Sequence, residues 1–345
     1  MRLAFCAGRQ AHTTELSAAQ TLSGVKDLAT ALRRSQEYLL GTQKPEGFWV
    51  GELIVDCTLV ADRLAYHHWN GSVDREWERK AINHLFSLQL PDGGWNIYFG
   101  GPAEVNATIK AYFALKLAGV SETDPRMLRA RSVALNLGGV PRMNTFSKLY
   151  LALFGLFPWK YVPTIPCEVL LIGKWFHVNF WEMSNWSRAM LVPLAIINHF
   201  KPTRHLDGIS LDELYPEGYH ERDLRLSRDP RILTTRNLFI WLDRLHKFAE
   251  LWAQAGIHPF RRRALERAEE WMLERFEGSD GLAAIFPAML NSLIALKALG
   301  YPDDHPQVAR AEQKLKALEH ETPHTVRVEP CFSPVWDTAI AVIAL

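Results

Sequence analysis

The chain is 345 residues long, carries a formal net charge of +1 and contains 22% charged residues. A chain of this length buries a sizeable core and can hold one large domain or two ordinary ones. Because the charge is low and balanced, no broad electrostatic field is available to attract nucleic acid, and we expect no nucleic-acid partner. The twelve tryptophans are a heavy aromatic load, typical of proteins whose large rings hold repeats together or line an apolar cavity.

The cysteines and the apolar runs indicate a cytosolic protein without a membrane-spanning helix. The first residues contain too short an apolar run for a signal peptide. The longest uncharged apolar runs, 149–159 and 189–200, are well short of the roughly 20 residues that span a bilayer, although a helix could lie on its surface. The cysteines are scattered, without CxxC spacing, and we expect reduced core thiols at Cys6, Cys57, Cys167 and Cys331.

The first half of the chain alternates between polar-faced and apolar helical segments. Residues 1–20 are predicted to form an N-terminal arm. Leu28, Leu32 and Leu39 recur at helical spacing in a charged segment, which predicts an outer helix with one buried stripe. The segment 52–69 is apolar around most of its circumference and is predicted to be an inner helix.

The same order of segments then recurs twice. Residues 76–88 are predicted to be an outer helix, and 105–119 an inner helix that ends at the capping glycine Gly119. Downstream, RALERAEEWMLERFEGSDGL precedes the apolar segment 291–300, which ends at Gly300. These repeats of about 45 residues predict paired helices that stack to bury their apolar faces. Strand patterns are sparse, so we predict an all-α fold, an α/α barrel of inner and outer helices, with a long surface excursion at 202–235.

Two turns between outer and inner helices share one pattern, glutamine, three residues, glycine, one residue and tryptophan. Glycine permits a tight turn, the glutamine amide can satisfy backbone groups at a helix end, and the indole can pack against them. We predict a structural role for these residues rather than a catalytic one. They are Gln43, Gly47, Trp49, Gln89, Gly93 and Trp95.

No familiar cofactor or metal motif is present. HETPH at 320–324 has the letters of a zinc-protease motif, but Pro323 opposes the helix that such a motif needs, and we predict a surface loop. Asp303 and Asp304 are predicted to lie in a loop or helix cap. Glycosidases need two carboxylates across a cleft. The sequence does not pair the candidates for that role, which are Asp56, Asp62 and Glu104.

The last residues, TAIAVIAL at 338–345, align with the inner-helix segment 108–115. There the helix continues to a capping glycine, whereas here the sequence stops. We therefore expect Leu345 to be a truncation point or the edge of a split frame.

The turn pattern and several longer segments resemble those of a known protein family. The turn pattern, as in Lys80-Ala81 through Trp95, is similar to the repeat of the triterpene cyclases. Longer segments resemble squalene–hopene cyclases in the same order, from about Gln36 to Leu345. They are YFGGPAEVNATIKAYFALK, LFGLFPWKYVPTIPCEVLL, MSNWSRAMLVPLAI, GIHPFRRRALERAEEWMLERFEGSDGLAAIFPAML and CFSPVWDTAIAVIAL.

The resemblance implies a protein about twice as long, built of two α/α barrels with a buried cavity between them. Such an enzyme closes squalene into hopene without a cofactor, after an aspartic acid of an Asp-x-Asp-Asp motif protonates a terminal double bond. It implies that residues 21–322 form the N-terminal barrel domain and that 323–345 begin the second, catalytic barrel. The implied partners are squalene, the missing C-terminal half or a second chain, and a second copy in a homodimer. The implied location is the cytoplasmic side of the inner membrane, as a peripheral, monotopic protein.

The resemblance also assigns substrate-binding residues, one position at a time. Trp186 and Trp336 match aromatic residues of the cavity, and Phe146 matches a neighbouring position. Met183 and Leu191 match the constriction through which squalene enters. The segment that lines the pocket is matched by Ile285, Phe286 and Pro287. Without the resemblance, each of these residues would be interpreted as ordinary core packing.

Two departures limit what is implied. The third turn has Phe276 where glutamine is expected and Leu282 where tryptophan is expected, which affects local stability. No Asp-x-Asp-Asp motif occurs in the sequence, so no catalytic residue is assigned and the proton donor is expected beyond Leu345. The alternatives are a non-enzymatic helical-repeat module that binds a lipid or a protein, and a fragment of a class II diterpene cyclase.

Overall fold

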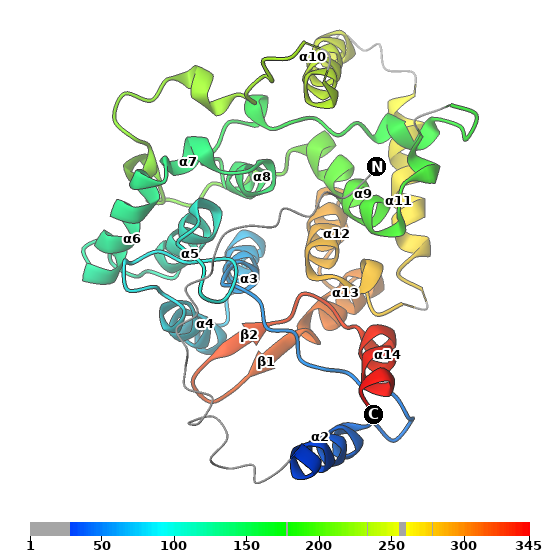
Figure 1. Ribbon diagram of the computed structural model, residues 1–345. Coiled ribbons are helices and arrows are strands. Elements are labelled where there is room, and N and C mark those ends of the chain that lie inside the picture. Colours follow the sequence, from blue (N-terminus) through cyan, green and yellow to red (C-terminus); the bar gives the residue numbers. More distant parts are fainter. Residues whose placement is uncertain (1–27, 177–178, 233, 255–259, 278) are drawn as a thin grey trace. The chain divides into compact units, whose positions relative to one another are not determined.

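The computed structural model describes residues 28–176, 179–232, 234–254, 260–277 and 279–345, and the predicted arm of residues 1–20 lies outside this part of the chain. Within the described residues the fold is mostly helical, with thirteen α-helices and one two-stranded sheet (Figure 1). The elements are α2 (Leu28–Thr42), α3 (Thr58–Asn70), α4 (Arg75–Ser87), α5 (Val105–Leu117), α6 (Pro125–Asn136), α7 (Gly139–Arg142), α8 (Thr145–Leu153), α9 (Asn185–Phe200), α10 (Thr235–Gln254), α11 (Arg261–Glu274), α12 (Phe286–Ala298), α13 (Pro306–Lys316), β1 (Glu319–Glu321), β2 (Val326–Val328) and α14 (Pro334–Ala344). Short 3₁₀ helices are η1 (Trp159–Tyr161), η2 (Cys167–Leu171), η3 (Phe180–Glu182), η4 (Asp212–Leu214), η5 (Glu221–Leu224) and η6 (Leu282–Ala284).

The contacts divide the chain into two compact units. One joins the described residues up to Gly51 to Ser333–Leu345, and the other is Glu52–Phe332. In the first unit the Trp49 N–H donates to Thr338 Oγ1 at 3.0 Å, and the Gly51 N–H donates to Asp337 Oδ2 at 2.9 Å. The division by contacts falls at Gly51 and Phe332, and the predicted domain boundary at residue 322 stays a prediction. Which barrel each unit represents stays a prediction.

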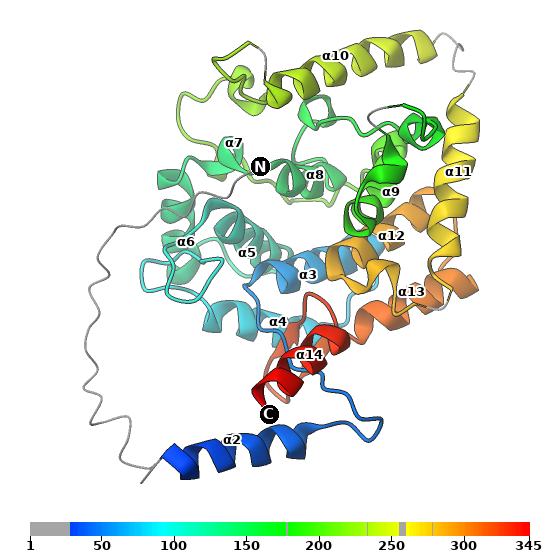
Figure 2. The ribbon, with the colours of Figure 1, turned by 45° about the vertical axis from the view of Figure 1, so that its right-hand side comes forward.

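The helices of the unit Glu52–Phe332 fall into a buried set and a more exposed set. In α5 and α12, ten of thirteen residues are buried, whereas only three are buried in each of α6 and α13. The buried helices α9 and α12, α12 and α3, and α3 and α5 contact one another, and α8 lies between α5 and α9 in both ribbon views (Figures 1 and 2). Exposed partners cover them: α4 packs on α3, α6 on α5, α13 on α12 and α11 on α9.

Glycines end two of the inner helices as the sequence predicts. Gly119 follows α5 with a φ of 82°, and Gly300 follows α12 with a φ of 92°. The Val120 N–H returns to the carbonyl of Leu115 at 3.0 Å, so the free carbonyls at the end of α5 are satisfied. The left-handed conformation is accessible to glycine without the steric cost that a Cβ atom adds.

The Gln-Gly-Trp turns have the same geometry twice. In the first, Gln43 Nε2 donates to the Gly47 carbonyl at 2.9 Å and Trp49 Nε1 to the Leu39 carbonyl at 2.7 Å. In the second, the corresponding bonds from Gln89 to Gly93 and from Trp95 to Leu85 are both 2.8 Å. The amide closes the turn, while the indole satisfies a carbonyl in the last turns of the preceding helix.

The second turn is also tied to the next outer helix. Gln89 Nε2 donates to the Arg126 carbonyl in α6 at 3.0 Å, and Trp95 is only 1% exposed. In the divergent third turn, Phe276 and Leu282 are buried and a serine supplies the polar contacts. Ser279 Oγ donates to the carbonyls of Arg275 and Gly281, at 2.6 and 3.1 Å. This turn therefore keeps its packing and replaces the glutamine bond with a hydroxyl bond.

Two predictions about helices are wrong. The predicted inner helix 52–69 begins only at Thr58, and residues 52–56 have no regular secondary structure, with the Leu53 N–H donating to Glu329 Oε2 at 3.3 Å. The predicted buried stripe of the first outer helix is not buried, since no residue of α2 is and Leu28 is 84% exposed. Apolar content predicted a buried helix at both places, but the described neighbours of residues 52–56 and of α2 do not bury these segments as helices.

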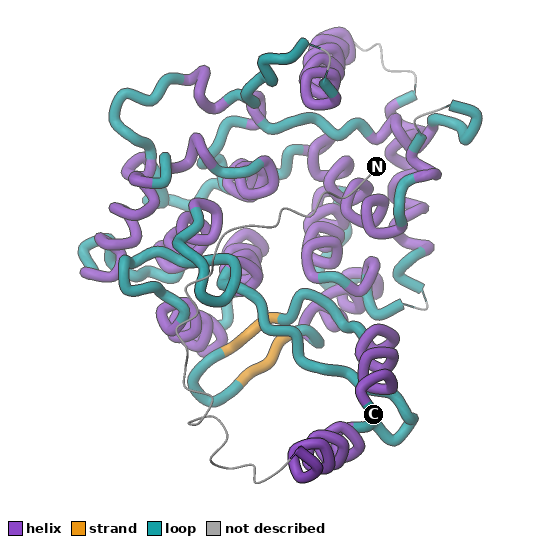
Figure 3. The backbone as a smooth tube through the Cα atoms, in the orientation of Figure 1, coloured by secondary structure: helices purple, strands orange, loops and turns teal. Residues whose placement is uncertain are grey.

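The prediction of a loop at HETPH needs a similar correction. His320 and Glu321 lie in β1, which pairs antiparallel with β2, and Thr322–Thr325 form the connecting turn (Figure 3). His320 Nε2 contacts Glu329 Oε1, and no cluster of three metal-ligating side chains occurs among the described residues. The mostly helical fold therefore includes one short hairpin that the sequence pattern did not predict.

The excursion at 202–235 contains neither α-helix nor strand before α10 begins, in the part of it that the structure describes. It is largely exposed, and three buried leucines anchor it to the helical body. They are Leu211, Leu214 and Leu224.

Candidate functional site

The inner helices of the unit Glu52–Phe332 begin side by side. Cys57, just before α3, has its thiol 3.6 Å from the carbonyl of Ala107 in the first turn of α5. The N–H of Asn144, which caps α8, donates to Asn106 Oδ1 at 2.8 Å. The N-terminal ends of α3, α5 and α8 are therefore adjacent, and residues in their first turns share one end of the unit.

One turn further along, four polar side chains from four inner helices meet in the interior. Lys110 Nζ of α5 pairs with Asp62 Oδ2 of α3 at 2.7 Å and lies 4.8 Å from the ring centre of Tyr150 on α8. The Tyr150 hydroxyl donates to Asn291 Oδ1 of α12 at 3.1 Å. Asp62 and Asn291 are buried, at 8% and 1% exposed. We call these four residues the interior polar cluster.

Burial controls the ionisation of this cluster. Burial raises the pKa of Asp62 above its usual value, and the nearby Lys110 ammonium opposes that rise. Burial also holds the pKa of Tyr150 well above its usual value, with a further contribution from the Asp62 charge. A buried carboxylate is stable only when it is paired, so Lys110 is what allows Asp62 to be charged among apolar helices.

The sequence indicated this cluster only in part. Asp62 was recognised as a carboxylate on an inner helix, but its partner was not. The available signal is Lys110 itself, a charged residue in the middle of the otherwise apolar segment 105–117. The contact with Asp62, 48 residues away, depends on how two helices are rotated about their axes, which periodicity does not specify.

The other carboxylates considered for glycosidase chemistry occupy helix ends. Asp56 Oδ1 accepts from the Thr58 N–H at 2.7 Å, where α3 begins. Glu104 caps α5 by accepting from the N–H groups of Asn106 and Ala107, at 2.8 and 2.9 Å. With Asp62 in an ion pair, each carboxylate has a structural partner, and the arrangement favours no pair of catalytic acids.

Asp303 and Asp304 lie in the exposed loop after α12. Asp303 pairs with Lys297, and the hydrogen bond from that lysine lowers the pKa of the carboxyl. The geometry gives this loop a surface role.

The residues assigned to the constriction and to the aromatic cavity wall lie around the start of α9 and α8. Trp186, in the first turn of α9, is 58% exposed, and Met183, just before this helix, is 41% exposed. Leu191 is half-buried on the same helix. Phe146, in the first turn of α8, is 51% exposed. Large apolar residues exposed at helix ends are available to contact a ligand or another protein surface.

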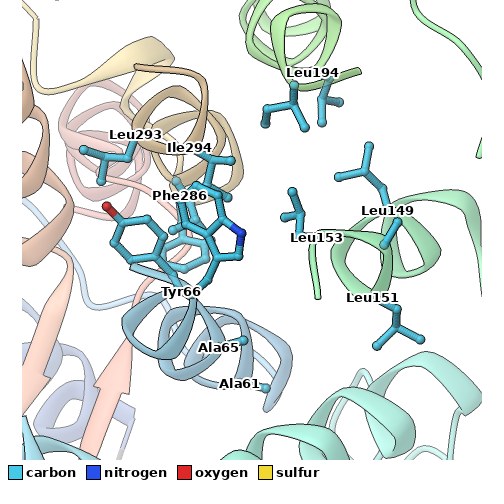
Figure 4. Close-up of a cluster of buried hydrophobic side chains, with 14 of the residues drawn as sticks. Ala61, Ala65, Tyr66, Leu149, Leu151, Leu153, Leu194, Phe286, Leu293 and Ile294 are labelled. Carbon is cyan, nitrogen blue, oxygen red and sulfur yellow. The ribbon is translucent and has the colours of Figure 1, made fainter. Parts of the chain in front are cut away.

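The pocket-lining segment lies at the start of α12, which packs against α9. Ile285 forms an isolated antiparallel bridge with Cys331, and the Phe286 N–H donates to the Pro330 carbonyl at 2.7 Å. Ile285 and Pro287 are half-buried. Phe286 is 1% exposed and lies among Tyr66, Leu293 and Ile294 (Figure 4), so in this structure it is a core residue.

Trp336 lies on α14, in the unit that joins the described residues up to Gly51 to Ser333–Leu345, and is 68% exposed. The structure thus brings the α9 and α12 residues together through helix packing. The assignment of all eight residues to a substrate site stays a prediction.

Comparison with known proteins decides the family. The family model described as the squalene-hopene cyclase N-terminal domain matches residues 32–324. The chain belongs to the squalene–hopene cyclase family. It is 39% identical over 328 residues to the squalene–hopene cyclase of Zymomonas mobilis, covering 92% of this chain and 49% of that protein. It is 36% identical over 320 residues to the squalene–hopene cyclase of Alicyclobacillus acidocaldarius, with the same coverage of 92% and 49%.

A third relative of this chain is named for a different product. The dammaradiene synthase of Dryopteris crassirhizoma is 34% identical over 330 residues, covering 95% of this chain and 47% of that protein. A solved type II terpene cyclase from Scytonema covers 83% of this chain at 14% identity, with a TM-score of 0.27. The chain spans about half the length of these three relatives from Zymomonas, Dryopteris and Alicyclobacillus.

Proposed function

We propose that this chain is the N-terminal half of a squalene–hopene-type cyclase, an isomerase that converts squalene into hopene in hopanoid biosynthesis. The observation that carries the proposal is the family match over residues 32–324, together with relatives named as squalene–hopene cyclases. The reaction proceeds by protonation of a terminal double bond and migration of carbocations. It needs an apolar cavity that excludes water and aromatic faces that stabilise positive charge, at about 1–2 kcal/mol for each desolvated contact.

The proposal includes a closed α/α barrel formed by the unit Glu52–Phe332. Its support is that α9, α12, α3 and α5 contact one another in that order and that α8 lies between α5 and α9 (Figure 2). The hydrogen bond from Tyr150 to Asn291 joins α8 to α12 across the interior. In the proposed domain organisation, Ser333–Leu345 begins the second, catalytic barrel.

The exposed apolar residues at the start of α8 and α9 support the proposed cavity wall. Phe146 and Trp186 each have about half of their surface in water, although large rings usually bury most of theirs. In the proposal these rings face squalene, Met183 and Leu191 form the entrance, and the second barrel covers the site. A cavity completed by a second domain explains why binding residues remain exposed in this chain.

The proton donor is assigned outside these 345 residues, because the sequence contains no Asp-x-Asp-Asp motif. The acid is then supplied by sequence beyond Leu345 or by a second chain. No cofactor is required, since proton transfer and carbocation rearrangement consume no redox equivalent and need no metal.

The test has two arms. The purified chain is incubated with squalene, alone and together with the separately expressed C-terminal half of the Alicyclobacillus acidocaldarius enzyme. We expect no hopene from the chain alone and hopene from the mixture, with a decrease when Trp186 is changed to alanine. Hopene from the chain alone, above a no-protein control, would contradict the proposal that these residues lack the catalytic acid. If the mixture gives no product and squalene does not quench the tryptophan fluorescence of the chain, a non-enzymatic helical-repeat module becomes the better interpretation.

Peripheral attachment to the cytoplasmic side of the inner membrane is part of the same proposal. None of the described helices is long and apolar enough to cross a bilayer. The support for surface attachment is α10, whose apolar stripe faces outward, with Leu238, Trp241, Leu245 and Phe248 each between 57 and 67% exposed. Spacings of three and four residues place these four side chains on one face of the helix.

The opposite face of α10 is fixed to the protein by polar contacts. Asp243 Oδ1 accepts from the Thr164 N–H at 2.7 Å, and Lys247 Nζ donates to the Val162 carbonyl at 3.0 Å. Asn237, in the first turn of the helix and at the edge of the apolar stripe, is 8% exposed, and its amide donates to the carbonyls of Asp229 and Arg231 in the preceding loop. A helix that holds its polar face against the protein and shows its apolar face to the surroundings is suited to a membrane surface. The spacing of the apolar residues in this segment is the signal in the sequence that predicts such a helix.

A further inference from the structure

A charged cavity of about 340 Å³ lies beneath α10. Its volume falls within the roughly 300–1,000 Å³ typical of small-molecule sites. Tyr161 and Ile240 form part of its apolar wall. Its charged lining consists of Lys160, Arg225, Arg244 and Lys247 together with Glu221 and Asp243.

The charges of this cavity do not cancel. Lys160 pairs with Glu221 at 2.6 Å, and Lys247 pairs with Asp243 at 2.9 Å. Four cations and two carboxylates leave a net charge of +2 in the lining, compared with +1 for the whole chain. The surplus charge is therefore local to this cavity.

The surplus belongs to two arginines. Within the described residues, neither Arg225 nor Arg244 lies in an ion pair. The Arg225 guanidinium lies 5.9 Å from the ring centre of Tyr161, which positions it without neutralising it. The Arg225 charge contributes to lowering the pKa of Glu221, but the direct ion pair of that carboxylate is with Lys160. Two guanidinium groups outside any ion pair provide the donor geometry that recognises a phosphate group.

The location of the cavity indicates where the phosphate comes from. Asp243 and Lys247 line the cavity from the side of α10 that faces away from its exposed apolar stripe. Arg244, three residues after Trp241 and four before Phe248, lines it from the border of that stripe. An amphipathic helix lying on a bilayer sinks its apolar face by about 5–10 Å, and a helix with its side chains is about 10–12 Å across. The polar side of α10 would then lie at the level of the lipid headgroups.

We propose that this cavity binds the phosphate-containing headgroup of an anionic phospholipid, with Arg225 and Arg244 as the contacting groups. The inference rests on the proposed attachment of α10 to a membrane and adds to it a lipid preference. A headgroup with net negative charge is favoured over a zwitterionic one, because the surplus positive charge repels a choline ammonium while attracting the phosphate.

The test is flotation of the full 345-residue chain with vesicles of phosphatidylcholine alone or mixed with phosphatidylglycerol. The cavity variant combines Arg225→Ala with Arg244→Ala. The matched control combines Arg228→Ala with Arg231→Ala, which removes the same charge from exposed side chains of the same segment that do not line the cavity. We expect the cavity variant to lose about 100-fold of its affinity for phosphatidylglycerol vesicles, because each arginine is proposed to make charge-assisted hydrogen bonds to the phosphate that are worth at least about tenfold. The control keeps most of its affinity.

Equal losses in the cavity and control variants would overturn the proposal, because they would show a diffuse charge effect. Absence of any preference for phosphatidylglycerol in the unaltered chain would overturn it as well. Titration with glycerol 3-phosphate in solution is a further arm. If the chain binds glycerol 3-phosphate in solution and the Arg225→Ala variant does not, the cavity is assigned to a soluble phosphate instead of a lipid headgroup.

A third variant separates this proposal from the one on which it rests. Changing Trp241 and Leu245 to glutamine removes apolar surface and leaves the cavity charges unchanged. If this variant floats with both vesicle types as well as the unaltered chain does, attachment through α10 fails. If this variant binds neither vesicle type, while the unaltered chain binds both equally, attachment through α10 is supported and only the headgroup site is refuted.

Discussion

Changing Gly93 to alanine tests whether the second Gln-Gly-Trp turn is held by close approach of a neighbouring helix. Gly93 has a φ of 101°, where an L-residue is strained, at about 1–2 kcal/mol. A Cβ atom at this position would also lie 2.4 Å from Arg129 Cβ and 2.9 Å from the Arg129 carbonyl carbon. Because the obstacle is the backbone of α6 rather than a flexible side chain, relief requires α6 to move, at a further cost of about 1–3 kcal/mol.

Gly300→Ala is the matched control. Gly300 has a similar φ of 92° in the same unit, but a Cβ atom there would have no neighbour within 4 Å. This variant carries the backbone strain alone, partly offset by the lower chain entropy of alanine in the unfolded state, which stabilises the protein by about 0.4–1 kcal/mol.

Urea unfolding followed by far-ultraviolet circular dichroism measures both variants. We expect Gly93→Ala to lower the free energy of unfolding by about 1–3 kcal/mol more than Gly300→Ala does, as a shift in midpoint at an unchanged slope. Equal losses in the two variants would refute the reasoning, because they would mean that α6 gives way at no cost and that the turn is held by its own hydrogen bonds.

Three further predictions concern buried polar groups. Trp95→Phe keeps an aromatic ring but removes the indole hydrogen bond to the Leu85 carbonyl, which then keeps only the Leu88 N–H at 3.2 Å, and a calorimetric comparison should show a loss of about 0.5–1.5 kcal/mol. Lys110→Met leaves the Asp62 carboxylate buried and unpaired, so chemical denaturation near neutral pH should show a loss of about 3–5 kcal/mol in the free energy of unfolding. This loss should shrink as the pH falls and Asp62 becomes protonated, and an unchanged loss in acid would contradict the ion pair. Burial lowers the pKa of His84 from 6.5 to about 4, so the folded state gives up stability as the pH falls through that window, by roughly 3 kcal/mol at most, and His84→Gln should flatten this part of the stability profile.

Local chemistry accounts for the features that were predicted correctly. Gly119 and Gly300 end helices because glycine reaches the left-handed conformation at low cost, and that preference belongs to the residue itself. The outer helix 76–88 and the inner helix 105–119 were placed within two residues of their observed bounds, since apolar periodicity reports directly which face of a helix is covered.

The errors occur where a neighbouring segment decides the outcome. Residues 52–56 are apolar enough for a helix, but they form no regular secondary structure, and the Leu53 N–H is bonded to Glu329, which directly follows β2. The hairpin itself was missed because β1 and β2 have three residues each, too few for an alternating pattern to be recognised.

The sequence by itself determined the family, the repeat of paired helices and the role of the glycine caps, because these depend on local spacing and on long collinear similarity. Only the tertiary structure decided that Lys110 pairs with Asp62, that α10 shows its apolar face outward, and that Arg225 and Arg244 share one cavity. Each of these depends on how helices distant in sequence are rotated and placed against one another. Periodicity defines the faces of a helix, and packing defines what each face meets.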